Sequence, residues 1–498
     1  MAAGFKVGTF TKSTNTSVPV DQAITGVGFQ PKALILFILP QTATGSNNDQ
    51  AFGIGFCAGT ASTDVHSHAA WCDHNVSTTA ASFRGANKAI TCTLASTGAA
   101  VCEADLKSFD SDGFTLTWTT NDANAYEMFF VAFGGSDITN VKLLKVSEQS
   151  GTGNKAYTGV GFQPSIIFLS NWGTSTNTTI FTEWGAAISS SKRWAQAICV
   201  QGGQTMTANV NAQSYQRTDS CLLTVTPTTG AEQNRYDFVS MDSDGFTLNQ
   251  VVQGLAGGNL KALCIKGGSW DLGNFTNATG TAPVDNTISG LAFQPDGYIL
   301  ATNTRAASTS VQLNSTLNIG AADGTNQCAM STNTTDATLP TSSQSTFDDA
   351  KVGTNTGGGY AVTHKQFNSD GFVVTFNPNA GGQFQNLWVA AKLTNVVGTI
   401  VTADVTTDAA VSQTVNKDVS SDAAVSQTVN KDVTTDAAVS QTVNKDVTTD
   451  AAVGMAAQKD VSSDAAVSRT ELKDVTTDAS ISVTGAVARS GFFNFFPM

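Results

Sequence analysis

Histidine is almost absent from this sequence of 498 residues, which contains four, and charged residues make up only 13% of it. None of the three common short catalytic motifs occurs: the Gly-x-Ser-x-Gly nucleophile turn, the Gly-x-x-x-x-Gly-Lys phosphate loop and the His-Glu-x-x-His zinc motif. Carboxylate pairs that hydrolyse glycosides need not be close in sequence, so the sequence leaves such a pair possible. We predict that the chain is not an enzyme and that it has no catalytic, cofactor-binding or metal site.

The sequence also lacks a basic cluster, a long apolar run and a secretory signal. The net charge is −13 and the isoelectric point is about 4.6, which argues against nucleic acid and anionic lipid as partners. The longest apolar run, Ala33 to Leu39, is too short to cross a bilayer, so no membrane insertion is expected. The first residues, Met1 to Lys6, do not have the pattern of a signal peptide, so we expect a product made in a cytosol.

The cysteines have no Cys-x-x-Cys spacing, and none of them is expected to bind metal through such a motif. Without an export signal we expect reduced and mostly buried thiols. The eight positions are Cys57, Cys72, Cys92, Cys102, Cys199, Cys221, Cys264 and Cys328.

The sequence does contain internal repeats. A Gly-Phe-Gln-Pro string around Phe29 returns around Phe162, and again with Ala in place of Gly around Phe293, in steps of 133 and 131 residues. A second string, Asp-Ser-Asp-Gly-Phe, ends at Phe114 and Phe246, and its third copy begins with Asn368. Two landmarks in one order, three times over, predict three homologous modules. The predicted ranges are 1–138, 139–268 and 269–396, followed by a repeat array at 397–485 and an aromatic tail at 486–498.

Each copy has the pattern of an all-β module. Its proline should lie just before a strand or at its first residue, because proline cannot donate to a β-ladder. The continuous apolar run that follows predicts a strand covered on both faces. An Asp-Gly turn then leads into an alternating strand, and a second apolar strand closes the copy. We predict three tandem β-sandwich or jelly-roll-like modules. The apolar runs are Ala33 to Leu39, Ile166 to Leu169 and Tyr298 to Ala301, and the closing strands are Met128 to Phe133, Leu260 to Ile265 and Leu387 to Leu393.

From Asp404 onward a 14-residue unit repeats at Asp418, Asp432, Asp446 and Asp460. An even period keeps the two faces of a strand in register, and Thr, Val, Asn and Asp are poor helix formers, so β structure is favoured over a coiled coil or disorder. One repeat cannot bury enough apolar surface to be stable alone. We therefore predict oligomerisation through residues 404–498, with a trimer favoured and a solenoid as the alternative. The four phenylalanines between Gly491 and Met498 are expected to contact another subunit.

Two side-chain groups resemble metal sites. His66, His68, Cys72 and His74 differ by even numbers, so a strand would present them on one side, where zinc or iron could bind. The other two copies have no counterpart, so a polar surface loop is favoured, and metal binding at these four residues stays open. The Asp-Ser-Asp-Gly string is shorter than an EF-hand loop and lacks its glutamate, so we interpret it as a plain turn.

The landmarks resemble a module of structural proteins from tailed bacteriophages and prophages. The residues that carry the resemblance are Thr25 to Pro31, Phe109 to Trp118, Val131 to Gly135 and Asp137 to Lys142. The second copy departs from it at Leu263 to Gly268, and the third at Ala292 and Asn368. The 14-residue array resembles β repeats of phage fibres. The resemblance implies a virion protein assembled in the host cytoplasm, and it carries over no site residues.

We expect a tail fibre or another appendage that builds the particle surface, contacts other virion proteins and can contact host glycan. The alternatives are a capsid decoration protein, a cell-surface adhesin or lectin, and a tailspike depolymerase, which is an enzyme. The sequence leaves open the choice between tail and capsid, the receptor and the oligomeric state.

Overall fold

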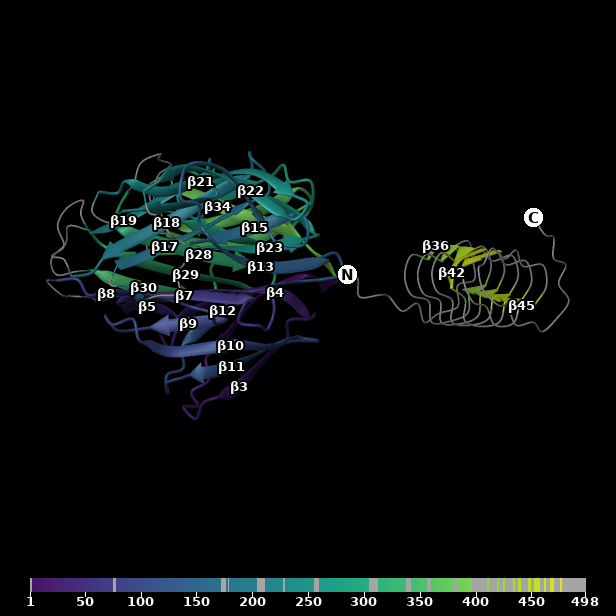
Figure 1. The fold of residues 1–498 in the computed structure, drawn as a ribbon, viewed down its shortest axis with the longest axis horizontal. Helices are drawn as coiled ribbons and strands as arrows, with labels where there is room; N and C mark the ends of the chain where they lie inside the picture. Colours follow the sequence, from purple (N-terminus) through teal and green to yellow (C-terminus); the bar gives the residue numbers. More distant parts are fainter. Residues whose placement is uncertain are drawn as a thin grey trace. The chain divides into compact units, whose positions relative to one another are not determined.

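In a computed structural model the chain forms two compact units, Met1–Asn395 and Val396–Met498. The structure describes residues 2–395 except 75–77, 172–175, 178, 204–210, 227–228, 255–258, 304–311, 337–341, 356–359 and 380–383. It also describes short strands between Ala410 and Thr476. The described residues form β-strands and no helix, which confirms the predicted all-β, jelly-roll-like fold class (Figure 1).

Each module has a four-stranded sheet and a seven-stranded sheet, both antiparallel, and one edge strand of the larger sheet comes from a neighbouring module. In the first module the four-stranded sheet has the order β3-β11-β10-β9 and the larger one the order β16-β8-β7-β6-β4-β12-β2. The strands of this module are β2 (Phe5–Thr11), β3 (Val20–Thr25), β4 (Pro31–Leu39), β5 (Gly45–Asn48), β6 (Gln50–Cys57), β7 (Val65–Cys72), β8 (Ala81–Ala86), β9 (Ile90–Thr93), β10 (Ala100–Asp110), β11 (Gly113–Thr120) and β12 (Glu127–Gly134). A short strand β1 (Ala2–Ala3) pairs with β35 (Thr394–Asn395).

The second and third modules repeat this pattern. In the second module the small sheet has the order β14-β22-β21-β20 and the large sheet the order β13-β23-β15-β17-β18-β19-β27. In the third module the orders are β25-β33-β32-β31 and β24-β34-β26-β28-β29-β30-β5. The strands of the second module are β13 (Asn140–Ser147), β14 (Gly153–Thr158), β15 (Ile166–Ser170), β16 (Thr176–Asn177), β17 (Thr179–Ala187), β18 (Arg193–Gln201), β19 (Ala212–Arg217), β20 (Leu222–Val225), β21 (Glu232–Asp242), β22 (Gly245–Gln253) and β23 (Asn259–Lys266). Those of the third are β24 (Ser269–Thr276), β25 (Val284–Ile288), β26 (Gly297–Thr302), β27 (Gln312–Leu313), β28 (Ser315–Ala322), β29 (Gln327–Thr334), β30 (Ser343–Asp348), β31 (Gly353–Thr354), β32 (Tyr360–Asn368), β33 (Gly371–Asn379) and β34 (Gln385–Lys392).

The continuous apolar runs are strands with two buried faces, as their sequence predicts. In β4, Ile35 and Phe37 belong to a core shared by all three modules, whereas Leu34 and Leu36 belong to the core between the two sheets of the first module. Pro31 is the first residue of this strand, and Pro164 and Pro295 each precede their strand by two residues. A strand that alternates between two cores has no face left for polar residues, so it contains almost none.

The two sequence landmarks are bonded to each other. Asp112 occupies the turn between β10 and β11, and its carboxylate accepts hydrogen bonds from the backbone N–H of Gly28 (2.6 Å) and of Gly26 (3.1 Å). Asp244 does the same for Gly161 (2.5 Å) and Gly159 (3.1 Å). The Asp-Ser-Asp-Gly string is thus a hairpin turn, as predicted, and it also holds the Gly-Phe-Gln-Pro segment that enters the next strand.

The third copy keeps this contact in a weaker form. Gly28 and Gly161 have φ angles of 85° and 84°, a conformation that favours glycine, and the equivalent residue in the third copy is Ala292. There the carboxylate of Asp370 accepts from the N–H of Gly290 at 3.3 Å, and no second backbone N–H donates to it among the described residues. The replacement of glycine by Ala292 in the third copy is therefore accompanied by the loss of one of the two hydrogen bonds to the aspartate carboxylate.

The glycine of the second landmark is required by a close backbone approach. A Cβ at Gly113 would lie 1.9 Å from the carbonyl oxygen of Ile24, and one at Gly245 would lie 2.0 Å from that of Tyr157. A Cβ at Gly371 would lie 1.9 Å from the carbonyl oxygen of Ile288. No other residue fits at these three positions unless the two strands separate.

The three seven-stranded sheets pack against one another around one apolar core. Rings from all three modules meet in it: Phe133 lies 5.9 Å from Phe168 and 5.6 Å from Trp270, and the last two are 6.2 Å apart between centroids. The buried members of this core come from all three modules. Residues 1–395 are therefore one compact unit in which the modules share an interior.

Each module adds one strand to the large sheet of a neighbour. β5 of the first module pairs with β30 of the third, β16 of the second pairs with β8 of the first, and β27 of the third pairs with β19 of the second. These three additions form a cycle, so the modules close into a ring with a pseudo-threefold pattern of contacts. Added strands also cover sheet edges that would otherwise be open to other chains.

In the second unit the repeats form parallel strands. One sheet has the order β36-β38-β40-β42-β44 and the other the order β37-β39-β41-β43-β45. Their bounds are Ala410–Val411, Ala424–Val425, Ala438–Val439, Ala452–Ala456 and Ala466–Arg469 in the first sheet, and Val419–Ser420, Val433–Thr434, Val447–Thr448, Val461–Ser462 and Val475–Thr476 in the second.

Ala410 pairs with Ala424 and Val419 with Val433, a step of one repeat. The described strands of successive repeats therefore stack in register, as in a solenoid, and the β interpretation of the array is confirmed for these strands. The aromatic tail at 486–498 lies outside the described residues.

Candidate functional site

An ion pair lies at equivalent positions in each of the three seams between modules. Lys6 of the first module pairs with Asp323 of the third (3.3 Å), and Lys142 of the second pairs with Asp64 of the first (3.5 Å). In each case the lysine lies at the start of the first strand of its large sheet, and the aspartate lies in the hairpin between two strands of the neighbour.

In the third seam the charges are exchanged. Asp271 of the third module occupies the position of Lys6 and Lys142, and it pairs with Lys192 in the hairpin of the second module. Asp271 would meet an aspartate in either of the other two seams, and Lys6 or Lys142 would meet Lys192 in this one. The exchange therefore helps to determine which modules adjoin at this seam.

Of the four candidate metal ligands, His66, His68 and Cys72 are buried on β7 and His74 is partly buried just beyond it, so the interpretation as a surface loop is wrong for the three residues on the strand. His66 and His68 are fully buried on β7. His68 Nε2 lies 3.0 Å from Thr182 Oγ1 of the second module, and Cys72 Sγ lies 3.4 Å from Ser343 Oγ of the third. Polar side chains at alternate positions indicated exposure, but here they face hydrogen-bonding partners on neighbouring modules.

These residues do not converge on one point. His66 Nδ1 is 3.3 Å from Asn87 Oδ1, and His74 Nδ1 is 2.7 Å from the carbonyl oxygen of Ser343. Burial, and secondarily the charge of His66, lowers the pKa of His68 well below its usual value, so this ring is neutral near pH 7. Within the described part of the chain no group of three or more His, Cys, Asp or Glu side chains is arranged to hold a metal ion.

The cysteines are buried free thiols, as expected from the sequence. Burial raises the pKa of Cys72 to about 12 and raises that of Cys264 further, so neither thiol is ionised near pH 7. Thiols in this state are poor nucleophiles and poor metal ligands.

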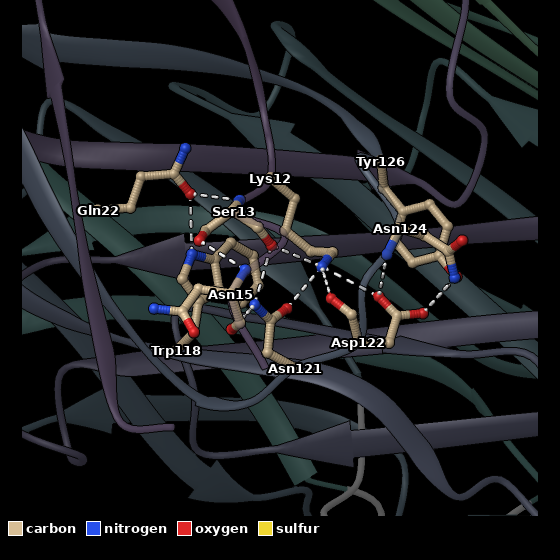
Figure 2. Close-up of polar contacts among 9 residues, drawn as sticks. All are labelled: Lys12, Ser13, Asn15, Gln22, Trp118, Asn121, Asp122, Asn124 and Tyr126. Atoms are coloured by element: carbon tan, nitrogen blue, oxygen red, sulfur yellow. Dashed lines mark hydrogen bonds and ion pairs between the residues drawn. The ribbon is translucent and has the colours of Figure 1, made fainter. Parts of the chain in front are cut away.

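A buried lysine lies between the two sheets of the first module, at one end of the sandwich (Figure 2). Lys12 follows β2 directly and is 1% exposed. Its ammonium donates to Asn121 Oδ1 (2.5 Å) and to the carbonyl oxygens of Ser13 (2.9 Å) and Asp122 (3.0 Å). It also pairs with the Asp122 carboxylate at 3.0 Å. The four contacts satisfy a charge that would otherwise be costly to bury.

Aromatic rings enclose the same ammonium. Lys12 Nζ lies 5.6 Å from the ring centroid of Trp118 and 5.3 Å from that of Tyr126. Although burial opposes ionisation of Asp122, hydrogen bonds from Tyr126, Asn124 and Lys12 outweigh it and lower the pKa of that carboxyl. The first module thus closes its interior with an internal cation.

The second module has the opposite charge at this place. Glu148 directly follows β13, as Lys12 directly follows β2, and it is 7% exposed. Its carboxylate accepts from Asn171 Nδ2 (2.9 Å) on the larger sheet and from Asn234 Nδ2 (3.1 Å) on the smaller one. A second carboxyl, Glu183, faces the same interior from β17 and is 2% exposed. Burial, and then the charge of Glu148, raises the pKa of Glu183 to about 8.

Several polar atoms at and around these two carboxyls are buried without a hydrogen bond of standard geometry among the described residues. They include the acceptors Glu183 Oε2 and Asn171 Oδ1 and the hydroxyl groups of Tyr157, Tyr236 and Thr224. Gln250, which is 1% exposed, has no partner for either amide atom. It is the sixth residue of β22 and so occupies the position of Trp118 in β11. Buried polar atoms normally have partners, so this concentration in one module requires an explanation.

The third module closes the same end without charge. Asn277 directly follows β24, and its backbone N–H donates to the carbonyl oxygen of Phe384 (3.1 Å). Phe376 occupies the position of Trp118, and it packs against Tyr360 at 5.8 Å between centroids. The polar groups at this end therefore differ among the three modules: a lysine paired with an aspartate in the first, two carboxyl groups in the second and uncharged groups in the third.

Sequence reasoning missed Lys12, Glu148 and Glu183. A signal was present, because the first two are at equivalent positions of the repeat and carry opposite charges. Alignment of the copies around those positions would have singled them out. Their burial could not be predicted, because it depends on how the ends of the two sheets close.

No protein-family model matches the sequence, and no curated protein matches it. Among solved structures, a chain from the atomic structure of Sulfolobus Turreted Icosahedral Virus is 12% identical over 52% of this chain and 90% of that chain, with a TM-score of 0.17. A chain from the structure on the triple jelly roll fold and turret assembly in an archaeal virus is 9% identical over 79% of this chain and 91% of that one, with a TM-score of 0.13. TM-scores this low carry no argument about function. No family match supports the resemblance to tailed-phage proteins, and none of the described residues forms a helix able to cross a membrane.

Proposed function

We propose that this chain is a structural component of a virus particle, and more specifically a tail fibre or similar surface appendage of a bacteriophage. The observation that carries the proposal is the use of the repeated residues. Asp112, Asp244 and Asp370 hold backbone turns, and the glycines beside them permit a close approach of strands. Residues that occur three times thus have architectural roles, as expected of a building block.

The ring closure supports the same proposal. Three modules that share one core and add strands to each other form a rigid unit without the help of another chain. Particle surfaces need such units, because an appendage must keep its shape outside the cell. The buried free thiols mean that this rigidity does not depend on disulfides among the described residues.

We further propose that the second unit is the part that associates with other chains, with a trimer as the favoured state. In its two sheets the terminal strands β36 and β44, and β37 and β45, each have one neighbour among the described strands. An open edge of a parallel stack is a site for pairing with another chain. Truncation after Gly398, followed by mass measurement in solution, should abolish the oligomer. An unchanged oligomeric state would contradict this part of the proposal.

The virion assignment can be tested in particles produced by a culture that expresses the chain. Particles purified on a density gradient should contain the chain at a constant ratio to the other particle proteins, as measured by mass spectrometry. Antibodies against residues 1–395 should label the tail if the chain is an appendage, and the shell if it is a decoration protein. A chain found only at the cell surface would instead support an adhesin. Release of reducing sugar from host capsule by the purified protein would support a depolymerase.

A further inference from the structure

We infer that Cys92 and Cys102 are a redox-active pair that forms a disulfide inside the first module under oxidising conditions. This inference does not depend on the proposed virion function. It rests on the placement of the two thiols in one β-ladder and on a comparison with the other cysteines of the chain.

The two cysteines face each other across a ladder. Cys92 on β9 pairs directly with Cys102 on β10, and both are fully buried in the core between the two sheets of the first module. Their thiol groups form a hydrogen bond with each other. Directly opposite residues of an antiparallel pair have Cα atoms about 4.5–5.5 Å apart, which lies within the range that a disulfide spans. The two strands therefore place the sulfur atoms where a bond can form between them.

This arrangement is not part of the repeated framework. In the described ladders none of the other six free cysteines lies opposite a second cysteine. The equivalent positions of the second module are Thr224 and Asn234, which also lie opposite each other. The fold of a module therefore forms without a thiol at either place, so an architectural need shared by the modules does not account for the cysteine pair.

The reaction is an exchange with a low-molecular-weight disulfide such as oxidised glutathione. The thiolate of one cysteine attacks the glutathione disulfide, forms a mixed disulfide and releases the first glutathione as its thiol. The second cysteine then attacks the cysteine sulfur of the mixed disulfide and releases the other glutathione. The protons of both cysteine thiols pass to the two glutathione molecules, which are reduced as the cysteines are oxidised.

Oxidation of the folded protein should be slow. The hydrogen bond with Cys102, and then burial, raises the pKa of the Cys92 thiol, so this thiol is protonated near pH 7. Protonated and buried thiols react slowly. The pair becomes accessible when β9 separates from β10, because β9 has four residues and forms an edge of its sheet. A chain that folds in a reducing compartment therefore keeps both thiols and acquires the bond only in an oxidising one.

The test uses the full-length protein, first reduced and then freed of reductant. It is incubated with oxidised glutathione just below its melting transition, denatured and alkylated. The reduced protein should carry eight alkyl groups and the oxidised protein two fewer. Trypsin does not cut between Cys92 and Cys102, so after oxidation the tryptic peptide of residues 89–107 should carry no alkyl group and be lighter by two hydrogen atoms than the same peptide with free thiols.

Cys92→Ala and Cys102→Ala should each lose no thiol in the same treatment. Cys264→Ala removes an equally buried thiol from the second module, so it is the matched control and should still lose two thiols from the peptide of residues 89–107. Eight alkyl groups on the native protein after oxidation would overturn the inference. Loss of thiols only outside that peptide, or a glutathione adduct on one cysteine of the pair in place of the internal bond, would overturn it too.

Discussion

The aspartate that joins the two landmarks gives a graded prediction within one molecule. Removal of the carboxylate by Asp112→Ala, Asp244→Ala or Asp370→Ala should destabilise the first two variants more than the third. The carboxylates of Asp112 and Asp244 each accept two backbone N–H bonds at 2.5–3.1 Å, whereas the carboxylate of Asp370 accepts one at 3.3 Å. The three substitutions are chemically identical, so differences among them report the local geometry.

The expected magnitudes follow from the number of bonds. A hydrogen bond contributes about 1 kcal/mol net, and more to a charged acceptor, but these sites are exposed and water competes. We therefore expect losses of about 2 kcal/mol for Asp112→Ala and Asp244→Ala and about 1 kcal/mol or less for Asp370→Ala. In a cooperative unit of 395 residues, 2 kcal/mol lowers the melting temperature by about 2–3 °C.

The assay is guanidinium unfolding followed by tryptophan fluorescence, together with scanning calorimetry. Asp105→Ala removes an exposed carboxylate that pairs with Lys88 and should cost less than about 0.5 kcal/mol, which sets the baseline. A loss for Asp370→Ala equal to or larger than the other two would refute the view that the aspartate bonds fix these turns.

Three further changes test the seams and the buried charges. Lys12→Met should lower the free energy of unfolding by about 3–5 kcal/mol in a denaturant titration, because it leaves Asp122 and Asn121 without their cation. A loss below about 1 kcal/mol would show that the network is dispensable. Asp271→Lys should cost about 1–3 kcal/mol of stability, because it brings a lysine against Lys192. The double variant Lys192→Asp/Asp271→Lys should recover at least half of this loss, because it gives the seam the same arrangement of charges as the other two. No recovery would mean that the pair does not act across the seam. The folded protein keeps the Glu183 proton up to about pH 8, whereas the unfolded chain loses it near pH 4.5, so stability falls as pH rises through this window. Glu183→Gln should therefore match the native protein at about pH 4 and exceed its free energy of unfolding by up to about 4 kcal/mol at pH 8. A constant difference across the range would refute the assignment.

The sequence predicted the elements of the fold well, because periodic patterns determined them. The run from Ala33 to Leu39 is apolar at every position, and it forms a strand between two cores. The alternating residues after Gly113 form a strand with one buried face, and the Asp-Gly pair before them forms the turn. Local signals of this kind depend on neighbours in the chain, so a single sequence contains them.

Contacts between modules could not be predicted in the same way. The polar residues between His66 and His74 indicated exposure, yet Thr182 and Ser343 of other modules contact His68 and Cys72 in this stretch and make it an interior. The short strand β5 gave no sequence signal, because its partner β30 lies about 300 residues away. The exchange of charge at Asp271 likewise acquires a meaning only when Lys192 is placed beside it.

The most direct test of the account is the thermal unfolding of residues 1–395 by differential scanning calorimetry. If three modules close into a ring around one core, they should unfold in a single transition with an enthalpy of roughly 280 kcal/mol, equal to the van't Hoff enthalpy. Three separate transitions, each with about a third of that enthalpy, would show that the modules are independent domains and would contradict the ring.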